Sequence, residues 1–204
     1  MFIVNVTIAG QISPEVLAGV GIGNTTILLL TQTLLQGFVN AMDQLATRAY
    51  GNNQLELCGV YLNRGRMIML TIFFPLALIL YLFSEAFISL FSSDPDVIHY
   101  GASYSKLTFV PMFIMQMSYQ QRSWLAAMRK IWIFSMIQVF SFSLYLPLST
   151  ILVFKYEMEI EGMALAMLIT CSLTYCLNLL LTYCQSDIQE ALFFPRKDSF
   201  QGWG

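Results

Sequence analysis

Charged residues are scarce in this sequence, and histidine is nearly absent. Of 204 residues, 11% are charged and one is a histidine, whereas about a quarter of a soluble domain is charged. Because 57% of the residues are hydrophobic, the composition is that of a membrane protein. The ten Lys and Arg residues form no long run and the formal net charge is −2, so nothing here points to nucleic-acid binding.

The residue patterns of enzymes and metal sites are also missing. The single histidine, His99, has no cysteine partner, and there is no Gly-x-Ser-x-Gly sequence. None of the four cysteines forms a Cys-x-x-Cys pair. The small residues 18–23 follow no strand, so they are no dinucleotide fingerprint and instead favour close packing of two helices. We therefore expect no enzymatic activity, no metal and no cofactor.

Long apolar stretches, in contrast, are plentiful. A membrane-spanning helix needs roughly 20 mostly apolar residues. Five segments qualify, and they lie at about 19–46, 66–91, 98–121, 131–154 and 162–184. Residues 1–9 look like the last half of a further helix, which is either re-entrant or begins before the chain does. The sequence thus predicts an all-α, polytopic membrane helix bundle of about six transmembrane helices, the first of them truncated.

The charges of the predicted loops alternate in sign. One side holds eight basic residues, namely Arg48, Arg64, Arg66, Arg122, Arg129, Lys130, Arg196 and Lys197. Only Lys155 is basic on the other side, which holds the acids Glu15, Glu85, Asp94, Asp96, Glu157, Glu159 and Glu161. The excess of Lys and Arg marks the first side as cytoplasmic. One span too many or too few would destroy this bias, so it supports the layout.

Asp43 is the sharpest functional candidate. The run from Gly19 to Asn40 before it contains no charge, and a carboxylate at the end of such a helix suggests a site of transport. Asp43 either exchanges a proton or pairs with a cationic substrate, or it is a helix-end acid that is solvated or paired with Arg48. Asn40, where the uncharged run ends, is a further candidate for the pathway.

Polar residues inside the third predicted span form a second candidate group. Gln116 and Gln120 are four residues apart and share one helix face, which should face the bundle or a wet cavity. Arg122 follows them. They either line a cavity or form hydrogen bonds between helices. Asn5 lies in the truncated first helix, where its amide needs a partner.

Three prolines fall inside three different predicted spans, at Pro75, Pro111 and Pro147. A proline removes a backbone hydrogen bond and bends a membrane helix. The alternatives are static packing and a bundle whose helices move, and three prolines in three spans favour the moving bundle.

Four stretches, taken in order, resemble one known family. At the end of its second helix the matching residues are Ala41, Asp43, Leu45, Ala49, Tyr50 and Gly51, although Ala46-Thr47-Arg48 replaces the family's Cys-Gly-Gln. The other matches are residues 10–21, then Pro111 with Arg122, and residues 161–166. Their order and spacing are similar to the eukaryotic branch of the multidrug and toxic compound extrusion (MATE) antiporters.

This resemblance implies a fold and a function. Family members have twelve helices in two six-helix lobes and exchange organic cations or other amphipathic small molecules for protons or sodium. The chain resembles the first lobe alone, with residues 1–184 as a six-helix membrane lobe and 185–204 as a cytoplasmic or interfacial linker to a second lobe. Its expected partners are the small-molecule substrate, the coupling ion, membrane lipid and that second lobe.

The resemblance also limits the coupling residues. Some members use an aspartate in the first helix, and the matching position here is Asn5, which cannot titrate. Asp43 is then the only acid in the predicted membrane core. The expected function is one lobe of a multi-pass antiporter in the plasma or vacuolar membrane, and the alternative is a non-transporting structural subunit or an inactive half-transporter fragment.

Overall fold

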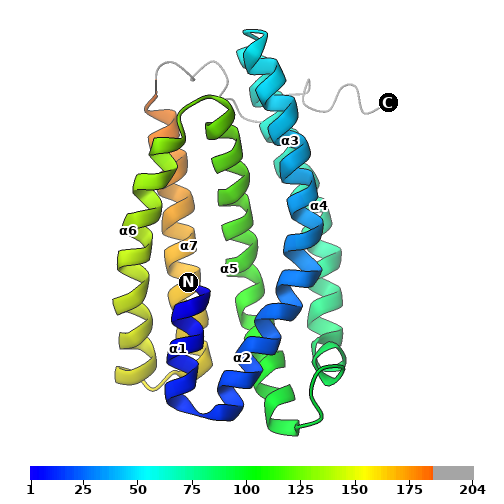
Figure 1. The fold of residues 1–204 in the computed structure, drawn as a ribbon, viewed down its shortest axis with the longest axis vertical. Helices are drawn as coiled ribbons and strands as arrows, with labels where there is room; N and C mark the ends of the chain where they lie inside the picture. Colours follow the sequence, from blue (N-terminus) through cyan, green and yellow to red (C-terminus); the bar gives the residue numbers. More distant parts are fainter. Residues whose placement is uncertain (186–204) are drawn as a thin grey trace.

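The computed structural model describes residues 1–185 as an all-helical bundle (Figure 1). Its helices are α1 (Phe2–Ile12), α2 (Pro14–Ile27), α3 (Thr33–Gly51), α4 (Leu55–Ser89), α5 (Pro95–Ala127), α6 (Ile131–Thr150) and α7 (Glu159–Tyr183). Two π-helical segments, η1 (Leu28–Gln32) and η2 (Ile151–Lys155), continue α2 and α6. The expected linker lies outside the described residues from position 186 onward. The prediction of a polytopic helix bundle is confirmed.

The expected spans agree with the helices in position but not in every property. In the described part of the chain, α4, α6 with η2, and α7 are each long and apolar enough to cross a membrane. A fourth span exists if Pro14–Leu30 and Thr33–Gly51, which meet at a bend of 44°, count as one. The expected span at 98–121 lies in α5, which has 33 residues but is not apolar enough to qualify.

The position of α5 explains why it is polar. It packs against α2, α3, α4, α6 and α7, and it stands in the middle of the bundle in Figure 1. A helix that is surrounded by other helices meets protein rather than lipid, so its polar side chains can find partners there. The polar residues expected inside the third predicted span thus lie on a helix that other helices surround.

Local sequence sets the turn between α1 and α2. Ser13 is extended, with φ −159° and ψ 160°, because the following Pro14 disfavours a helical residue before it. The Ser13 Oγ accepts a hydrogen bond from the backbone N–H of Val16 at 3.1 Å and so caps α2. Pro14 begins α2, where its missing N–H costs nothing.

Glycines bring α2 against α5. A Cβ atom on Gly19 would lie 2.9 Å from the backbone nitrogen of Gly101, and one on Gly23 would lie 2.8 Å from the Gly101 carbonyl oxygen. Neither backbone atom can give way without moving a helix. The small-residue stretch at 18–23 thus packs two helices closely, as the sequence predicts.

The ends of the helices separate the charges. Figure 1 shows the turns between α3 and α4 and between α5 and α6 at the upper end, and the turns between α1 and α2, between α4 and α5 and between α6 and α7 at the lower end. Arg48 lies in the last turn of α3 and Arg129 in the α5–α6 turn, whereas Asp94 caps α5 and Glu157 precedes α7. Arg48 and Arg129 thus lie at the end opposite to Asp94 and Glu157, as the predicted alternation requires.

Candidate functional site

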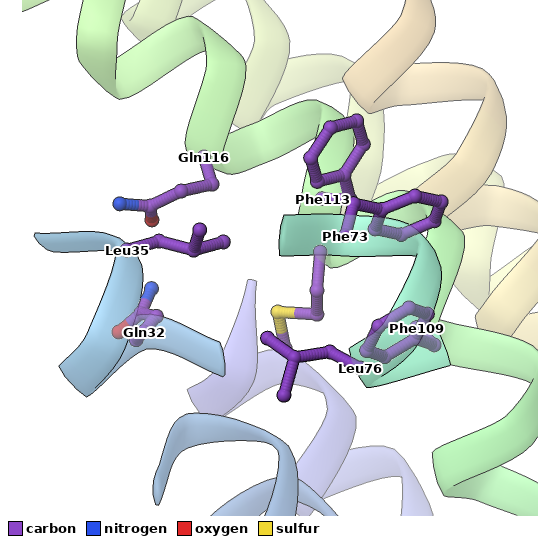
Figure 2. A pocket seen from close by; sticks show the side chains of 8 residues that line it. Gln32, Leu35, Phe73, Leu76, Phe109, Phe113 and Gln116 are labelled. Atoms are coloured by element: carbon purple, nitrogen blue, oxygen red, sulfur yellow. The ribbon is translucent and has the colours of Figure 1, made fainter. Parts of the chain in front are cut away.

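A pocket lies between η1, α3, α4 and α5 (Figure 2). Its lining residues are Gln32, Leu35, Phe73, Leu76, Phe109, Met112, Phe113 and Gln116. In Figure 2, Gln32, Leu35 and Gln116 lie on one side and the three phenylalanines on the other. The cavity volume is about 10 Å³, which is room for about one water molecule and far too little for an organic substrate.

Three amides connect this pocket to the surface of α3. Gln116 donates through Nε2 to Oε1 of Gln36 at 3.2 Å, and Gln36 donates through Nε2 to Oδ1 of Asn40 at 3.2 Å. Gln36 and Asn40 are exposed, whereas Gln116 is 2% exposed. Within the described residues, Oε1 of Gln116 has no hydrogen-bond partner. The candidates Asn40 and Gln116 therefore belong to one chain of amides that ends in an unpaired acceptor.

Gln36 belongs to this row of hydrogen-bonded amides but was not among the residues predicted from the sequence. The spacing of Gln32, Gln36 and Asn40, each four residues after the last, was the available signal. Residues at this spacing share one face of a helix. The same rule led to Gln116 and Gln120, and it applies equally well to this helix.

Aromatic rings form the opposite wall of the pocket. The ring of Phe73 lies 5.0 Å from that of Phe109 and 3.9 Å from that of Phe113, measured between centroids. Phe73 comes from α4 and the other two from α5. Stacked rings of this kind make a compact apolar surface whose faces are negative.

A second buried amide, Asn5, joins three helices. Asn5 of α1 donates through Nδ2 to the hydroxyl of Tyr104 on α5 at 2.9 Å. The hydroxyl of Tyr145 on α6 donates to Oδ1 of the same Asn5. All three residues are at most 1% exposed. The expected partner of Asn5 thus exists, but the two tyrosines had no local sequence signal, because they are far from Asn5 in the chain.

Asp43 and Gln120 meet at a separate small pocket. It measures about 10 Å³ and also includes Leu62, Ser123 and Trp124 among its lining residues. Gln120 is 2% exposed and donates to the carbonyl of Leu62 at 3.4 Å. Asp43 is half-buried, and no hydrogen bond or ion pair of its carboxylate occurs among the described residues. The expected alternative of a pair with Arg48 is not formed.

Arg122 lies apart from the other candidates. It is exposed, and its guanidinium carbon lies 5.8 Å from the ring centroid of Phe134 on α6. The structure thus brings Gln116 together with Asn40, and Gln120 with Asp43, but does not bring Arg122 to either pocket.

Pro75, Pro111 and Pro147 lie inside α4, α5 and α6 as predicted. Within residues 1–185, no three His, Cys, Asp or Glu side chains are grouped so that they could hold a metal ion.

A family model decides the relationship of this chain to known proteins. The MatE model matches residues 1–151, which is most of the chain. The chain belongs to the MatE family. Among curated relatives, Protein DETOXIFICATION 39 of Arabidopsis thaliana is 26% identical over 79% of the chain and 32% of its own length. Protein DETOXIFICATION 32 of the same plant is 26% identical over 78% of the chain and 31% of its own length.

Solved MATE structures have the same fold. The crystal structure of the eukaryotic MATE transporter AtDTX14 matches with a TM-score of 0.92 and 19% identity, over 98% of this chain and 45% of that one. An inward-facing multidrug resistance MATE family transporter matches with a TM-score of 0.80 and 14% identity, over 98% and 46%. This MatE chain is therefore an integral membrane helix bundle. It spans about a third of the curated relatives and less than half of the solved chains.

Proposed function

We propose that this chain works as one lobe of a secondary transporter that exports organic cations or other amphipathic small molecules in exchange for protons or sodium. The observation behind the proposal is the MatE match over residues 1–151, supported by the shared fold. The helix bend of 44° between Pro14–Leu30 and Thr33–Gly51 and the three interior prolines suit a bundle that alternates between two shapes.

The size of the pockets supports a substrate site that is completed by another surface. Three pockets inside the bundle measure about 10, 10 and 20 Å³, whereas small-molecule sites measure about 300–1,000 Å³. An organic cation therefore needs a cavity outside this bundle. Residues 1–184 then form the six-helix lobe, the segment 185–204 leads to a second lobe, and the exposed amides of Gln36 and Asn40 are candidates for the shared wall.

Asp43 is the proposed coupling carboxylate. It is half-buried beside Gln120, and its oxygens have no partner within the described residues. A carboxylate without a fixed counter-ion can take up a proton or attract a cation in turn. Asn5 is an amide and cannot replace it. The membrane is the plasma or vacuolar membrane.

An exchange of Asp43 tests this role in the full gene product. Purified protein is reconstituted into proteoliposomes, and these vesicles are loaded with a fluorescent organic cation. Efflux of the cation is then measured under an imposed proton or sodium gradient. Asp43→Asn should lower gradient-driven efflux about tenfold or more, because the side chain loses its negative charge. Membrane insertion should be unchanged, because asparagine has nearly the same shape as aspartate. Glu15→Gln, which changes an exposed acid at the other end of the bundle, is the matched control. Equal efflux and equal pH dependence in both variants would contradict the role of Asp43.

A second candidate is a non-transporting subunit or an inactive half-transporter. It is favoured by Ala46-Thr47-Arg48, which replaces the family's Cys-Gly-Gln beside Asp43. Reading the genomic DNA beyond the codon for Gly204 separates the two candidates. A second lobe in frame supports the transporter, whereas a stop codon together with no copurifying half-transporter supports the second candidate.

A further inference from the structure

Three sulfur-bearing side chains line a cavity on the other side of α5. Met1, which precedes α1, Met115 of α5 and Cys171 of α7 face this cavity, whose volume is about 20 Å³. The thiol of Cys171 donates to Sδ of Met1, and the two sulfur atoms are 3.9 Å apart. Figure 1 shows the N-terminus halfway up the bundle, beside α7. A cavity of this volume has room for one water molecule or one ion and for no organic molecule.

The donor atoms of this cavity suit a soft ion. Besides the sulfurs, its lining residues offer hydroxyls and the amide of Gln138, and among the described ones there is no carboxylate, imidazole, lysine or arginine. The hydroxyls of Ser118 and Thr174 already donate to backbone carbonyls of their own helices. Calcium and magnesium need several oxygen ligands, and zinc is usually held by thiolates, imidazoles or carboxylates. One thiolate together with thioethers suits Cu(I) instead.

The distance between the sulfurs fits one shared ion. With metal–sulfur bonds of about 2.3 Å, an ion bonded to two sulfurs 3.9 Å apart has an angle of about 116° between the bonds. This angle lies between the tetrahedral and the trigonal value, so the thioether of Met115 can be a third ligand. Cys171 lies at the midpoint of α7, about 18 Å from either helix end. A thiolate paired with Cu(I) is neutral, and so it costs less at that depth than a lone charge.

A row of methionines leads along α7 to Cys171. Met163 and Met167 precede it at intervals of four residues, so the three sulfurs share one helix face. All three side chains are buried. The row begins beside Glu159 and Glu161, two exposed acids in the first turn of α7 that attract cations. The helix thus presents a series of soft donors from the acidic end of the bundle to the cavity.

We propose that Met1, Met115 and Cys171 bind one Cu(I) ion. The thiol of Cys171 releases its proton to water as the ion binds, so a Cu–S bond replaces the S–H bond and copper stays in the same oxidation state. The two thioethers complete the coordination, and the ion connects the start of α1 with α5 and α7. This site goes beyond the proposed export of organic cations, because its cavity admits no organic molecule.

Competition with a Cu(I) chelator tests the site. The full chain in phosphatidylcholine nanodiscs is titrated with copper in the presence of ascorbate and bathocuproine disulfonate, and the copper kept by the protein is measured. Wild type should keep one ion per chain, and Cys171→Ser should weaken binding about hundredfold or more, because the anionic ligand is lost. Cys58→Ser is the matched control and should keep the ion, since Cys58 is also buried but donates to the carbonyl of Ala46 in another cluster.

Methionine variants test the thioether ligand. Met115→Leu should weaken binding about tenfold. Met117→Leu on the same helix should change it less than about twofold, because Met117 packs with Leu35 and Val39 instead. Saturating Cu(I) should also raise the melting temperature of wild type and not that of Cys171→Ser, because only a bound ion stabilises the folded state. Equal affinities of the two methionine variants would contradict the role of Met115.

A measurement on wild type keeps the test decisive if Cys171→Ser does not fold. X-ray absorption at the copper edge should show sulfur neighbours at about 2.3 Å, and a shell of nitrogen or oxygen alone would overturn the site. It would also be overturned if wild type kept no copper against the chelator, or if Cys171→Ser and Cys58→Ser lost the ion equally. The transporter proposal is tested separately by efflux, and it stands or fails independently of these results.

Discussion

Asn5 and Gln116 are both buried amides in an apolar bundle, but their surroundings differ. Asn5 has partners for both halves of its amide, because Tyr104 accepts from Nδ2 and Tyr145 donates to Oδ1. Gln116 has a partner for Nε2 alone, and its Oε1 is left without one among the described residues. The first amide ties α1, α5 and α6 together, whereas the second links two helices and leaves one acceptor open.

The difference separates a structural polar group from a functional candidate. A fully paired amide gains its stability inside the chain and has nothing left to offer a ligand. An amide with one unpaired atom lowers stability in the empty state and regains it when a donor arrives. Burial alone does not distinguish these cases, since Asn5 is 1% and Gln116 is 2% exposed.

Of the two amides Asn5 and Gln116, the larger loss of stability is expected for Asn5→Leu. The change removes two hydrogen bonds and leaves two buried tyrosine hydroxyls without Asn5. Because such bonds inside membrane proteins contribute about 0.6–1.7 kcal/mol each, the free energy of unfolding should fall by about 1–3 kcal/mol. Thermal melting of the chain in nanodiscs measures this. The control is Thr7→Val, an exposed position on the same helix. Equal melting of both variants would mean that the Asn5 network adds no stability.

A smaller loss is expected for Tyr145→Phe. It removes one of the two bonds and leaves Oδ1 of Asn5 unpaired, so stability should fall by about 0.6–1.7 kcal/mol. The double variant Asn5→Leu with Tyr145→Phe should be no less stable than Asn5→Leu alone, because the shared bond is lost only once. Strictly additive losses would show that Asn5 and Tyr145 act independently.

The sequence predicted the fold well where hydropathy and charge repeat. The positions of the five expected spans, the short first helix and the charges at the helix ends follow from the pattern of hydropathy and charge along the chain. Helix bounds were less predictable. The second expected span began at 66, but α4 begins at Leu55, since a helix can extend beyond the membrane with residues such as Glu56 and Arg64. The π-helical segment η1 contains neither proline nor glycine, so its sequence gave no basis for predicting the bend.

The candidate site was predicted only in part. Spacing four residues apart showed that Gln116 and Gln120 share a face, and both are buried. Which of their atoms have partners depends on α3 and α4, whose packing the local sequence does not specify. The partners Gln36, Tyr104 and Tyr145 were not predicted, because each lies on a different helix from the amide that it contacts. The separation of Arg122 from this face follows from its outward position at the end of α5, next to Phe134.

The smallest change in stability is expected for Gln116→Met. It gives up one bond to the exposed Gln36 but also removes an unpaired oxygen, so the free energy of unfolding should change by about 0.5 kcal/mol or less. Gln121→Met on the same helix is the matched comparison. Gln121 donates to Thr182 and to the carbonyl of Asn178, and accepts from Arg66. Its loss should therefore cost about 1–3 kcal/mol. Equal losses in the two variants would mean that Gln116 is as fully paired as Gln121, and the distinction between the two kinds of buried amide would fail.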